Sequence, residues 1–340
     1  MIIDQDARGP ATTDLLSVLF LLQSPEVEPL GITVVSGDQW RDEEVAHTLR
    51  LLELLGRTEI PVVPGAVFPL LNSKEEAERR ERLFGRLAYK GAWNEQKVPG
   101  YDGAWNRGQY YGPFVVPPLP EGRPSARPAE EHAANFIIRM LRKFPRQVTL
   151  FAAGPLTNVA LAVRLDPAVP ELACELVVMG GSLSPIEAAE LHFSLHSRRE
   201  FNFWWDPEAA QIVLRSAWKK VTVTPVDISI KTRLTRAMIK EIGKATTPAA
   251  RYVACWADEE YMWDELAAAA WLEPSLITRA ESLYMDVDIN HGAGYGDTLT
   301  WRPGENPGLG ERLVRVHLDA DTARFYRMFI KRITRPVLGA

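Results

Sequence analysis

The 340-residue chain has few cysteines, no long hydrophobic run and no excess of positive charge. Its two cysteines, Cys174 and Cys255, are too few for a disulfide framework and favour a reducing compartment. The longest stretch without a charged residue, Gln147–Val163, is broken by Gly154 and Pro155, so we expect no transmembrane helix. We therefore expect a cytoplasmic location; a secreted protein whose signal peptide had been removed would have the same sequence.

The balance of charges argues against a nucleic-acid partner. Lys and Arg number 39 against 44 Asp and Glu, which gives a net charge of −5, whereas binding to phosphate backbones needs clustered positive charge. The chain is instead rich in aromatic and turn-forming residues, with 10 Trp, 25 Pro and 23 Gly. Many of them lie in an irregular segment, 88–128, and a loop of that length inside a compact fold is usually functional or an oligomer contact.

Short apolar runs alternate with helical patterns along the chain, which is typical of strand–helix–strand units. Strands are predicted at 1–3, 30–35, 60–63, 148–151, 175–179 and 221–226, and helices at 15–22, 43–55 and 157–165 and from Asp206-Pro207 onward. A helical, aromatic-rich segment covers 248–272. The pattern predicts an α/β fold with a Rossmann-like core, in which helices flank a doubly wound, mostly parallel sheet.

Polar residues follow several of the predicted strands directly. They are Asp4, Asp6, Asp38, Gly180-Gly181 and Asp227. Ligands of open parallel sheets bind beyond the carboxyl ends of the strands, so these residues are the first candidates for a site. Carboxylates gathered there would repel one another, and a raised pKa or a bound hard cation relieves that repulsion. For any single Asp, a turn or capping role is an equally simple interpretation.

Four short motifs follow the predicted strands in a fixed order. They are Ile2–Asp6 with Asp14, Ser36-Gly37-Asp38 and 51–66; Gly154–Asn158 with Val177–Gly181; Glu200–Ala210; and Trp263-Asp264 at the start of a helix. Their order and spacing resemble the calcium-dependent nucleoside hydrolase family, the ribonucleoside N-glycosidases. The resemblance implies one nucleoside hydrolase-like domain over residues 1–340, with 88–128 as a loop insertion and 248–272 as a wall of the base pocket. It also implies hydrolysis of the N-glycosidic bond of a nucleoside.

The resemblance implies a calcium site. Its ligands would be the carboxylates of Asp6, Asp14 and Asp264 and the main-chain carbonyl of Ala153. Such an all-oxygen set suits calcium, whereas zinc would want the His or Cys that these positions lack. Asp6 would also be the general base that takes a proton from the attacking water.

The resemblance also implies residues that bind the nucleoside, the one small-molecule partner expected. They are Asp38, Met179, Glu200, Asn202 and Trp263. Trp263 stands where many family members have a His that protonates the leaving base, and purine-preferring members instead stack an aromatic side chain on the purine. Trp93 or Trp105 is a candidate for the opposite face of that stack, and a place in the core is an equal alternative. Family members are commonly dimers or tetramers, so we expect a homodimer or homotetramer, with 115–128 as a candidate contact.

The first motif departs from the family pattern. Seven residues separate Asp6 from Asp14 where the family has four, and Thr13 stands where the family has a further Asp that binds the ribose hydroxyls. A hydroxyl at Thr13 would replace one hydrogen bond but not the charge-assisted pair. Arg8, in the extension, either adds a positive charge near the metal or points to solvent, and we favour solvent.

Two other classes stay open at this point. A magnesium-dependent phosphohydrolase of the haloacid dehalogenase type also begins with a strand and Asp-x-Asp, and it would use Asp4 as nucleophile and Asp6 as acid–base. That class leaves Glu200–Asn202 and Trp263-Asp264 unexplained. A protein with the nucleoside hydrolase fold that binds nucleosides without turnover would fit the missing Asp.

Overall fold

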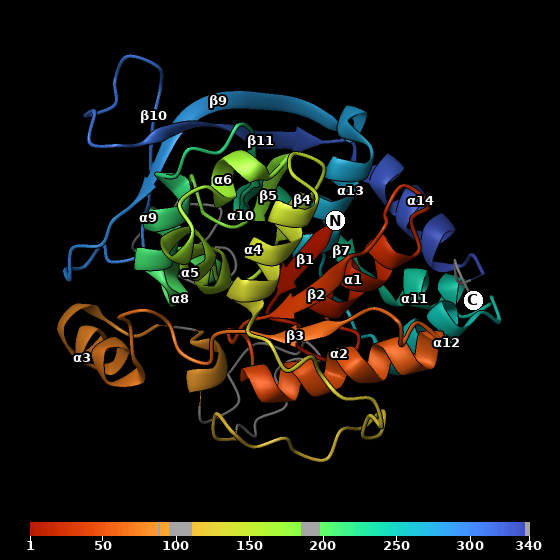
Figure 1. The fold of residues 1–340 in the computed structure, drawn as a ribbon. Helices are drawn as coiled ribbons and strands as arrows, with labels where there is room; N and C mark the ends of the chain where they lie inside the picture. The colour runs from red at the N-terminus through yellow and green to blue at the C-terminus, as the bar shows by residue number, and fades with distance from the viewer. Residues whose placement is uncertain (88, 95–110, 185–197, 337–340) are drawn as a thin grey trace.

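One nine-stranded sheet forms the centre of the computed structural model, which describes residues 1–87, 89–94, 111–184 and 198–336 (Figure 1). Its strands are β1 (Ile2–Gln5), β2 (Gly31–Val34), β3 (Val62–Pro64), β4 (Thr149–Ala152), β5 (Glu175–Met179), β6 (Val221–Thr224), β9 (Ile277–Val287), β10 (Thr298–Trp301) and β11 (Arg312–Ala320). Their order across the sheet is β10-β9-β11-β6-β5-β4-β1-β2-β3. The pairs from β3 to β11 are parallel, and β9 and β10 extend the sheet in antiparallel fashion. Strands predicted on both sides of the irregular segment 88–128 therefore form one sheet.

Helices cover both faces of this sheet (Figure 1). They are α1 (Thr13–Leu22), α2 (Arg41–Leu55), α3 (Lys74–Phe84), α4 (Ala133–Lys143), α5 (Thr157–Leu165), α6 (Val169–Leu172), α8 (Phe201–Trp205), α9 (Pro207–Leu214), α10 (Val226–Ser229), α11 (Arg236–Ile242), α12 (Pro248–Trp256), α13 (Trp263–Leu272) and α14 (Thr322–Ile333). Two short 3-10 helices, η1 (Gly91–Trp93) and η2 (Pro274–Leu276), and a small antiparallel pair, β7 (Arg233–Leu234) with β8 (Glu260–Tyr261), complete the described elements.

The core lies in two layers because successive strand residues point to opposite faces. Ile3 of β1 packs in the layer that contains α1, α2, α12, α13 and α14, whereas the neighbouring Ile2 packs in the layer of α4, α5 and α9. All five residues of β5 are buried, as expected for a parallel strand covered on both sides. This arrangement confirms the predicted fold class.

Several predicted boundaries are confirmed, and others shift. α5 and β5 have the predicted bounds, and α2 ends at Gly56 in the left-handed conformation, with φ of 70°. β6 ends at Thr224 because Pro225 has no N–H for the ladder and α10 follows. The aromatic segment 248–272 is divided into α12, β8 and α13 rather than continuous.

The described part of the predicted irregular segment, 89–94 and 111–128, contains only η1. Residues 119–126 lie along α2, where Glu53 Oε1 accepts hydrogen bonds from the N–H groups of Ser125 (2.6 Å) and Ala126 (2.7 Å). Buried His47 of α2 pairs with the Glu121 carboxylate. Side-chain contacts therefore fix this part of the loop where the backbone has no regular structure.

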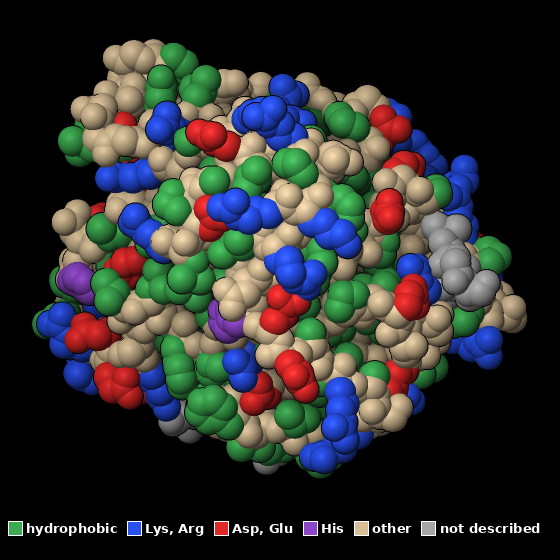
Figure 2. Space-filling model, in the orientation of Figure 1, with side chains coloured by type: hydrophobic (Ala, Val, Ile, Leu, Met, Phe, Trp, Pro, Cys, Tyr) green, Lys and Arg blue, Asp and Glu red, His purple; other side chains and the backbone are tan. Residues whose placement is uncertain are grey.

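The surface in the orientation of Figure 1 carries basic and acidic side chains interspersed with scattered apolar ones (Figure 2). Such mixing differs from the single-sign patch of a phosphate-backbone binder. Among the described residues, no helix is both long enough and apolar enough to cross a membrane.

Candidate active site

The predicted site residues meet at the carboxyl edge of the parallel strands. Asp6 directly follows β1, Ala153 directly follows β4, and Met179 is the last residue of β5. Asp38 lies in the connection from β2 to α2, and Asp264 lies in the first turn of α13, which packs on α1. The open end of a parallel sheet is the usual place for a ligand site.

Three of these acids form a buried cluster, which we call the acid cluster: Asp6, Asp14 and Asp264. Each side chain is at most 4% exposed. Burial raises the pKa of all three well above the usual range, and the negative charges of the neighbouring acids raise it further. Asp14 lies in the first turn of α1 and not ahead of the helix, since α1 begins at Thr13. Protonation of some of these carboxyl groups or a bound cation would relieve the repulsion in this buried space.

Neighbouring groups hold one oxygen of each acid. The backbone N–H of Asp38 donates to Asp6 Oδ2 at 3.0 Å. Gln5 Nε2 donates to Asp264 Oδ2 at 2.8 Å, and Thr12 Oγ1 donates to Asp14 Oδ2 at 2.8 Å.

Two glycines allow the backbone to approach Asp6 closely. A Cβ atom on Gly37 would lie 2.8 Å from Asp6 Cβ and Cγ and still closer to Oδ2, and one on Gly154 would lie 2.6 Å from the Asp6 nitrogen. Real Cβ atoms do not lie at such distances, so a side chain at either position would force Asp6 or the backbone beside it to move.

The chemistry of the acid cluster fits a hard divalent cation. Carboxylate oxygens and the nearby Ala153 carbonyl are the oxygen ligands that such cations prefer. Within the described residues, no three or more His, Cys, Asp or Glu side chains are arranged to hold a metal ion. The acids instead accept the hydrogen bonds from Asp38, Gln5 and Thr12.

Glu200 and Asn202 lie at the start of α8, beside the acid cluster. Glu200 caps α8 by accepting hydrogen bonds from the N–H groups of Asn202 (2.8 Å) and Phe203 (3.1 Å), and it also accepts one from Gly181 (2.8 Å). Burial raises the pKa of Glu200 to about 7 in spite of these bonds, so this side chain is not a solvated surface charge. Asn202 Nδ2 donates to the carbonyl oxygens of Met179 (3.2 Å) and Ala153 (3.4 Å). One amide therefore joins the ends of β4 and β5 to α8.

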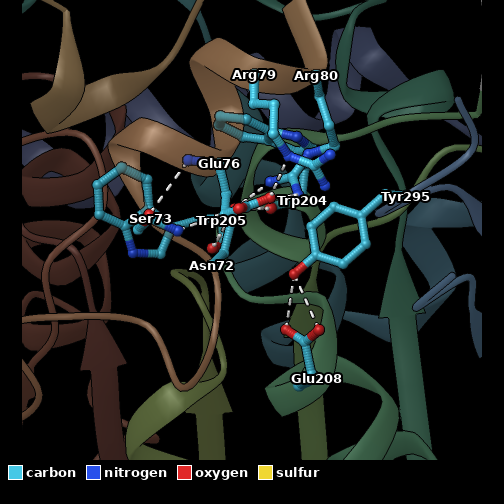
Figure 3. Close-up of polar contacts among 9 residues, drawn as sticks. All are labelled: Asn72, Ser73, Glu76, Arg79, Arg80, Trp204, Trp205, Glu208 and Tyr295. Carbon is cyan, nitrogen blue, oxygen red and sulfur yellow. Dashed lines mark hydrogen bonds and ion pairs between the residues drawn. The ribbon is translucent and has the colours of Figure 1, made fainter. Parts of the chain in front are cut away.

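A polar network contacts the C-terminal end of α8 (Figure 3). Asn72 Nδ2 donates to the carbonyl oxygens of Trp204 and Trp205, both at 3.2 Å. The Tyr295 hydroxyl donates to the Glu208 carboxylate at 2.9 Å, and the Arg80 guanidinium lies 4.0 Å from the centre of the Tyr295 ring. Asn72 thus holds the C-terminal end of α8, and the Tyr295–Glu208 bond holds the start of α9, which follows it.

Arg8 does not point to solvent. Its side chain is 4% exposed, and its Nη1 atom lies 3.5 Å from Asp38 Oδ2 and 3.5 Å from the Tyr89 hydroxyl. The expectation of a solvated Arg8 was wrong because the loop after β1 turns inward. A positive charge therefore stands beside Asp38 at the edge of the acid cluster.

Thr13 does not offer its hydroxyl proton to a ligand. Its Oγ1 donates to Glu265 Oε2 at 2.7 Å and accepts from the Asp264 N–H at 3.3 Å. The suggested replacement of a sugar hydrogen bond by Thr13 is thus not supported by the structure.

The aromatic residues take different roles. Half-buried Trp263 begins α13, and its ring centre lies 4.8 Å from that of Tyr261. Trp93 stacks on Trp205 with ring centres 4.0 Å apart, in a separate aromatic core with Trp40 and Trp204. Trp93 thus fills the core and is not available to stack on a base. Trp105 lies outside the described residues.

Asp4 belongs to the sheet rather than to the site. It is fully buried and accepts hydrogen bonds from Thr33 Oγ1 (2.5 Å) and Asn158 Nδ2 (2.8 Å). A nucleophile must reach its substrate, so this placement does not fit the role that a haloacid dehalogenase-type enzyme would give to Asp4.

Two acids near the site were missed from the sequence. Glu260 of β8 accepts the Thr13 N–H at 3.3 Å, and burial raises its pKa to about 7. Glu265 follows Asp264 and is 1% exposed. Its position next to a predicted ligand was the only available signal; Glu260 had none, because its short strand lies in a stretch predicted as helix.

The fold and the site define an α/β protein with a cluster of buried carboxylates at the carboxyl edge of a parallel sheet. The family model "Inosine-uridine preferring nucleoside hydrolase" matches residues 1–327. The chain belongs to this nucleoside hydrolase family, whose members are enzymes that hydrolyse the N-glycosidic bond of nucleosides.

Relatives with different base preferences resemble the chain. Uridine nucleosidase 1 of Arabidopsis thaliana is 26% identical over 94% of this chain and 89% of its own length. The pyrimidine-specific ribonucleoside hydrolase RihA of Salmonella arizonae is 32% identical over 75% of this chain and 68% of its own length. The solved structure of a purine-preferring ribonucleoside hydrolase from Gardnerella vaginalis covers 98% of this chain and 97% of its own, with a TM-score of 0.73 and 24% identity, which shows the same fold.

Proposed function

We propose that this enzyme hydrolyses the N-glycosidic bond of a purine ribonucleoside, or of a modified purine-like nucleoside, with the help of calcium. The observation that carries the proposal is the acid cluster of Asp6, Asp14 and Asp264 beside Glu200 and Asn202. Buried carboxylates with raised pKa values are typical of a site that binds a cation and moves protons.

Asp6, Asp14, Asp264 and the Ala153 carbonyl would hold the calcium ion. When bound, the cation would neutralise the carboxylates and polarise water and sugar hydroxyls as a Lewis acid. The oxygen-only donor set supports calcium or magnesium over zinc, and the flexible shell of calcium suits a set that mixes side-chain and main-chain oxygens.

Asp6 acts as the general base that takes a proton from the attacking water. Burial and the neighbouring acids raise the pKa of Asp6, which makes its carboxylate a stronger base, and the Asp38 N–H orients that carboxylate. The sugar becomes positively charged as the bond to the base breaks, and the carboxylates around it stabilise that charge. Glu200, Asn202, Met179 and Asp38 position the sugar.

The leaving base needs a proton or an equivalent stabilisation. The residue directly before Asp264 is Trp263 rather than a His, and its aromatic side chain is half-buried. Stacking on Trp263 supports a purine, whose larger ring system gains more from the contact than a pyrimidine does.

Purified protein should release ribose from a purine nucleoside such as inosine, and it should lose this activity when a chelator removes calcium. A panel of inosine, guanosine, adenosine, uridine and cytidine would establish the base preference. A higher kcat/KM for uridine or cytidine than for every purine would contradict the purine preference. Activity unaffected by exhaustive chelation would contradict the metal requirement.

A second candidate is nucleoside binding without turnover. Thr13, which replaces an Asp and whose hydroxyl is engaged with Glu265, favours it. Calorimetric binding of inosine to the calcium-loaded protein without release of ribose would identify this function.

A further inference from the structure

The loop between β1 and α1 buries a positively charged side chain, which the first motif of the family did not lead us to expect. Arg8 lies in this loop, and its guanidinium is among the buried groups of the site. Arg8 is one of the seven residues between Asp6 and Asp14, a segment three residues longer than the four of the family pattern.

Several elements hold the loop in place. The Ala11 N–H donates to the Tyr252 hydroxyl of α12 at 2.8 Å, and Thr12 Oγ1 lies within hydrogen-bond distance of the Arg8 carbonyl oxygen. Gly9 packs so closely on His47 of α2 that a Cβ atom would lie 2.6 Å from the His47 Cβ. Because the backbone is fixed on both sides of Arg8, its side chain has little freedom to leave the site.

Arg8 faces acids from two other elements. Burial raises the pKa of Asp38, from the β2–α2 connection, and of Glu260, from β8, and the positive charge of Arg8 opposes that rise at both groups. The negative charge of Asp38 in turn acts on Asp6, Asp14, Glu200 and Asp264. The Arg8–Asp38 pair therefore lies at the point where the acid cluster and the Glu200 side of the site meet.

A guanidinium beside a carboxylate complements a pair of hydroxyl groups. Each hydroxyl can accept a hydrogen bond from Arg8 and donate one to Asp38, and both bonds are charge-assisted. An anionic substituent would gain from Arg8 but would be repelled by Asp38 and Glu260. The arrangement therefore fits a neutral diol better than a phosphate or a carboxylate.

We propose that Arg8 is a specificity-determining residue that, together with Asp38, binds the vicinal hydroxyls of the sugar in place of the carboxylate that Thr13 does not supply. This inference rests on the proposed function, because it concerns the sugar of the same substrate. It assigns to the loop extension the selection of ribonucleosides against 2′-deoxyribonucleosides.

Arg8→Gln and Arg8→Lys should be compared with the wild type on inosine and 2′-deoxyinosine. Loss of a charge-assisted bond should raise KM for inosine about 10- to 100-fold in Arg8→Gln, with a smaller change in kcat. KM for 2′-deoxyinosine should change by less than about threefold, so selectivity for the ribonucleoside falls. Arg8→Lys, which keeps the charge but loses the planar fork, should fall between the two. Arg50→Gln is the matched control, because Arg50 pairs with Glu53 on α2, outside the site.

Binding provides a readout that does not need turnover. Titration of the calcium-loaded protein with ribose and with 2-deoxyribose should show a preference for ribose that Arg8→Gln removes. Equal changes for both sugars, no change for either, or tighter binding of ribose 5-phosphate than of ribose that depends on Arg8 would overturn the proposal. A wild type that cleaves no nucleoside but shows the Arg8-dependent preference for ribose would instead contradict only the proposed function.

Discussion

Replacement of Gly37 by Ala tests whether the position of Asp6 controls the reaction. The new Cβ would lie 2.1 Å from Asp6 Oδ2 and 2.8 Å from Asp6 Cβ and Cγ, whereas ordinary contacts begin at 3.4 Å. The Cβ and Cγ atoms must therefore move by about 0.6 Å and the carboxylate oxygen by about 1.3 Å. Residue 37 itself cannot withdraw easily, because its N–H donates to the Gln39 carbonyl (3.0 Å) and its carbonyl accepts from the Ala92 N–H (2.9 Å). The strain should therefore fall on the Asp6 carboxylate and on its bond from the Asp38 N–H.

We expect kcat/KM for inosine to fall about 100-fold in Gly37→Ala, because a catalytic group misplaced by a fraction of an ångström to one ångström loses its alignment. The free energy of unfolding should fall by only about 1–3 kcal/mol, the usual cost of overpacking. The assays are steady-state ribose release and thermal unfolding. Gly292→Ala, at a position with no heavy atom within 4 Å of the new Cβ, is the control and should leave both unchanged. A Gly37→Ala protein with more than half of the wild-type kcat/KM would refute the reasoning.

Three further predictions concern other residues. Asp14→Ala should abolish calcium binding measured by calorimetry while the circular dichroism spectrum stays native; retained binding would remove Asp14 from the proposed ligands. Trp263→Ala should lower kcat/KM for inosine at least about tenfold and for uridine by less than about threefold, since loss of a stacking contact costs roughly 1–2 kcal/mol; equal losses on both would contradict the stacking role. Burial and the charge of Arg315 lower the pKa of His317 to about 4, so protonation favours the unfolded chain, and stability should fall as the pH drops from about 6.5 towards 4. His317→Asn, which can still accept from the Thr224 hydroxyl, should reduce this loss by about 2 kcal/mol in denaturant titrations at pH 7 and pH 4.5; an unchanged pH dependence would argue against a depressed pKa.

The fold could be predicted because each strand and helix is specified by residues within it or next to it. Apolar runs such as Glu175–Met179 are long enough for one buried strand, and the Gly and Pro residues around them mark the ends. The amphipathic pattern over 43–55 with Gly56 behind it gave α2 to within two residues. Each of these signals lies within a dozen residues of the element that it specifies.

Parts of the site depend on contacts between segments that are far apart in the sequence, and the local sequence pattern does not predict such contacts. Arg8 is polar and follows a strand, so solvent exposure was the simple interpretation, yet Tyr252 and His47 turn its loop inward. Trp93 lies in an irregular segment, and only its stacking on Trp205 assigns it to the core. The role suggested for Thr13 was based on the Asp that stands at this position in the family. In the structure its hydroxyl donates to Glu265, which is far away in the sequence.

The hydrogen bond from Gln5 to Asp264 joins residues 259 positions apart. A growing chain presents Asp6 and Asp14 almost at once, but it acquires the third carboxylate only when α13 has been synthesised and has packed on α1. Contacts between residues far apart in sequence form slowly during folding. The entropy cost of closing the long loop between them must be met before the contact contributes any stabilising free energy. The three acids thus meet only after strands β1 to β6 have been synthesised, while β9, β10 and β11 still follow along the chain. Any cation taken up there would stabilise this late contact rather than guide the earliest folding.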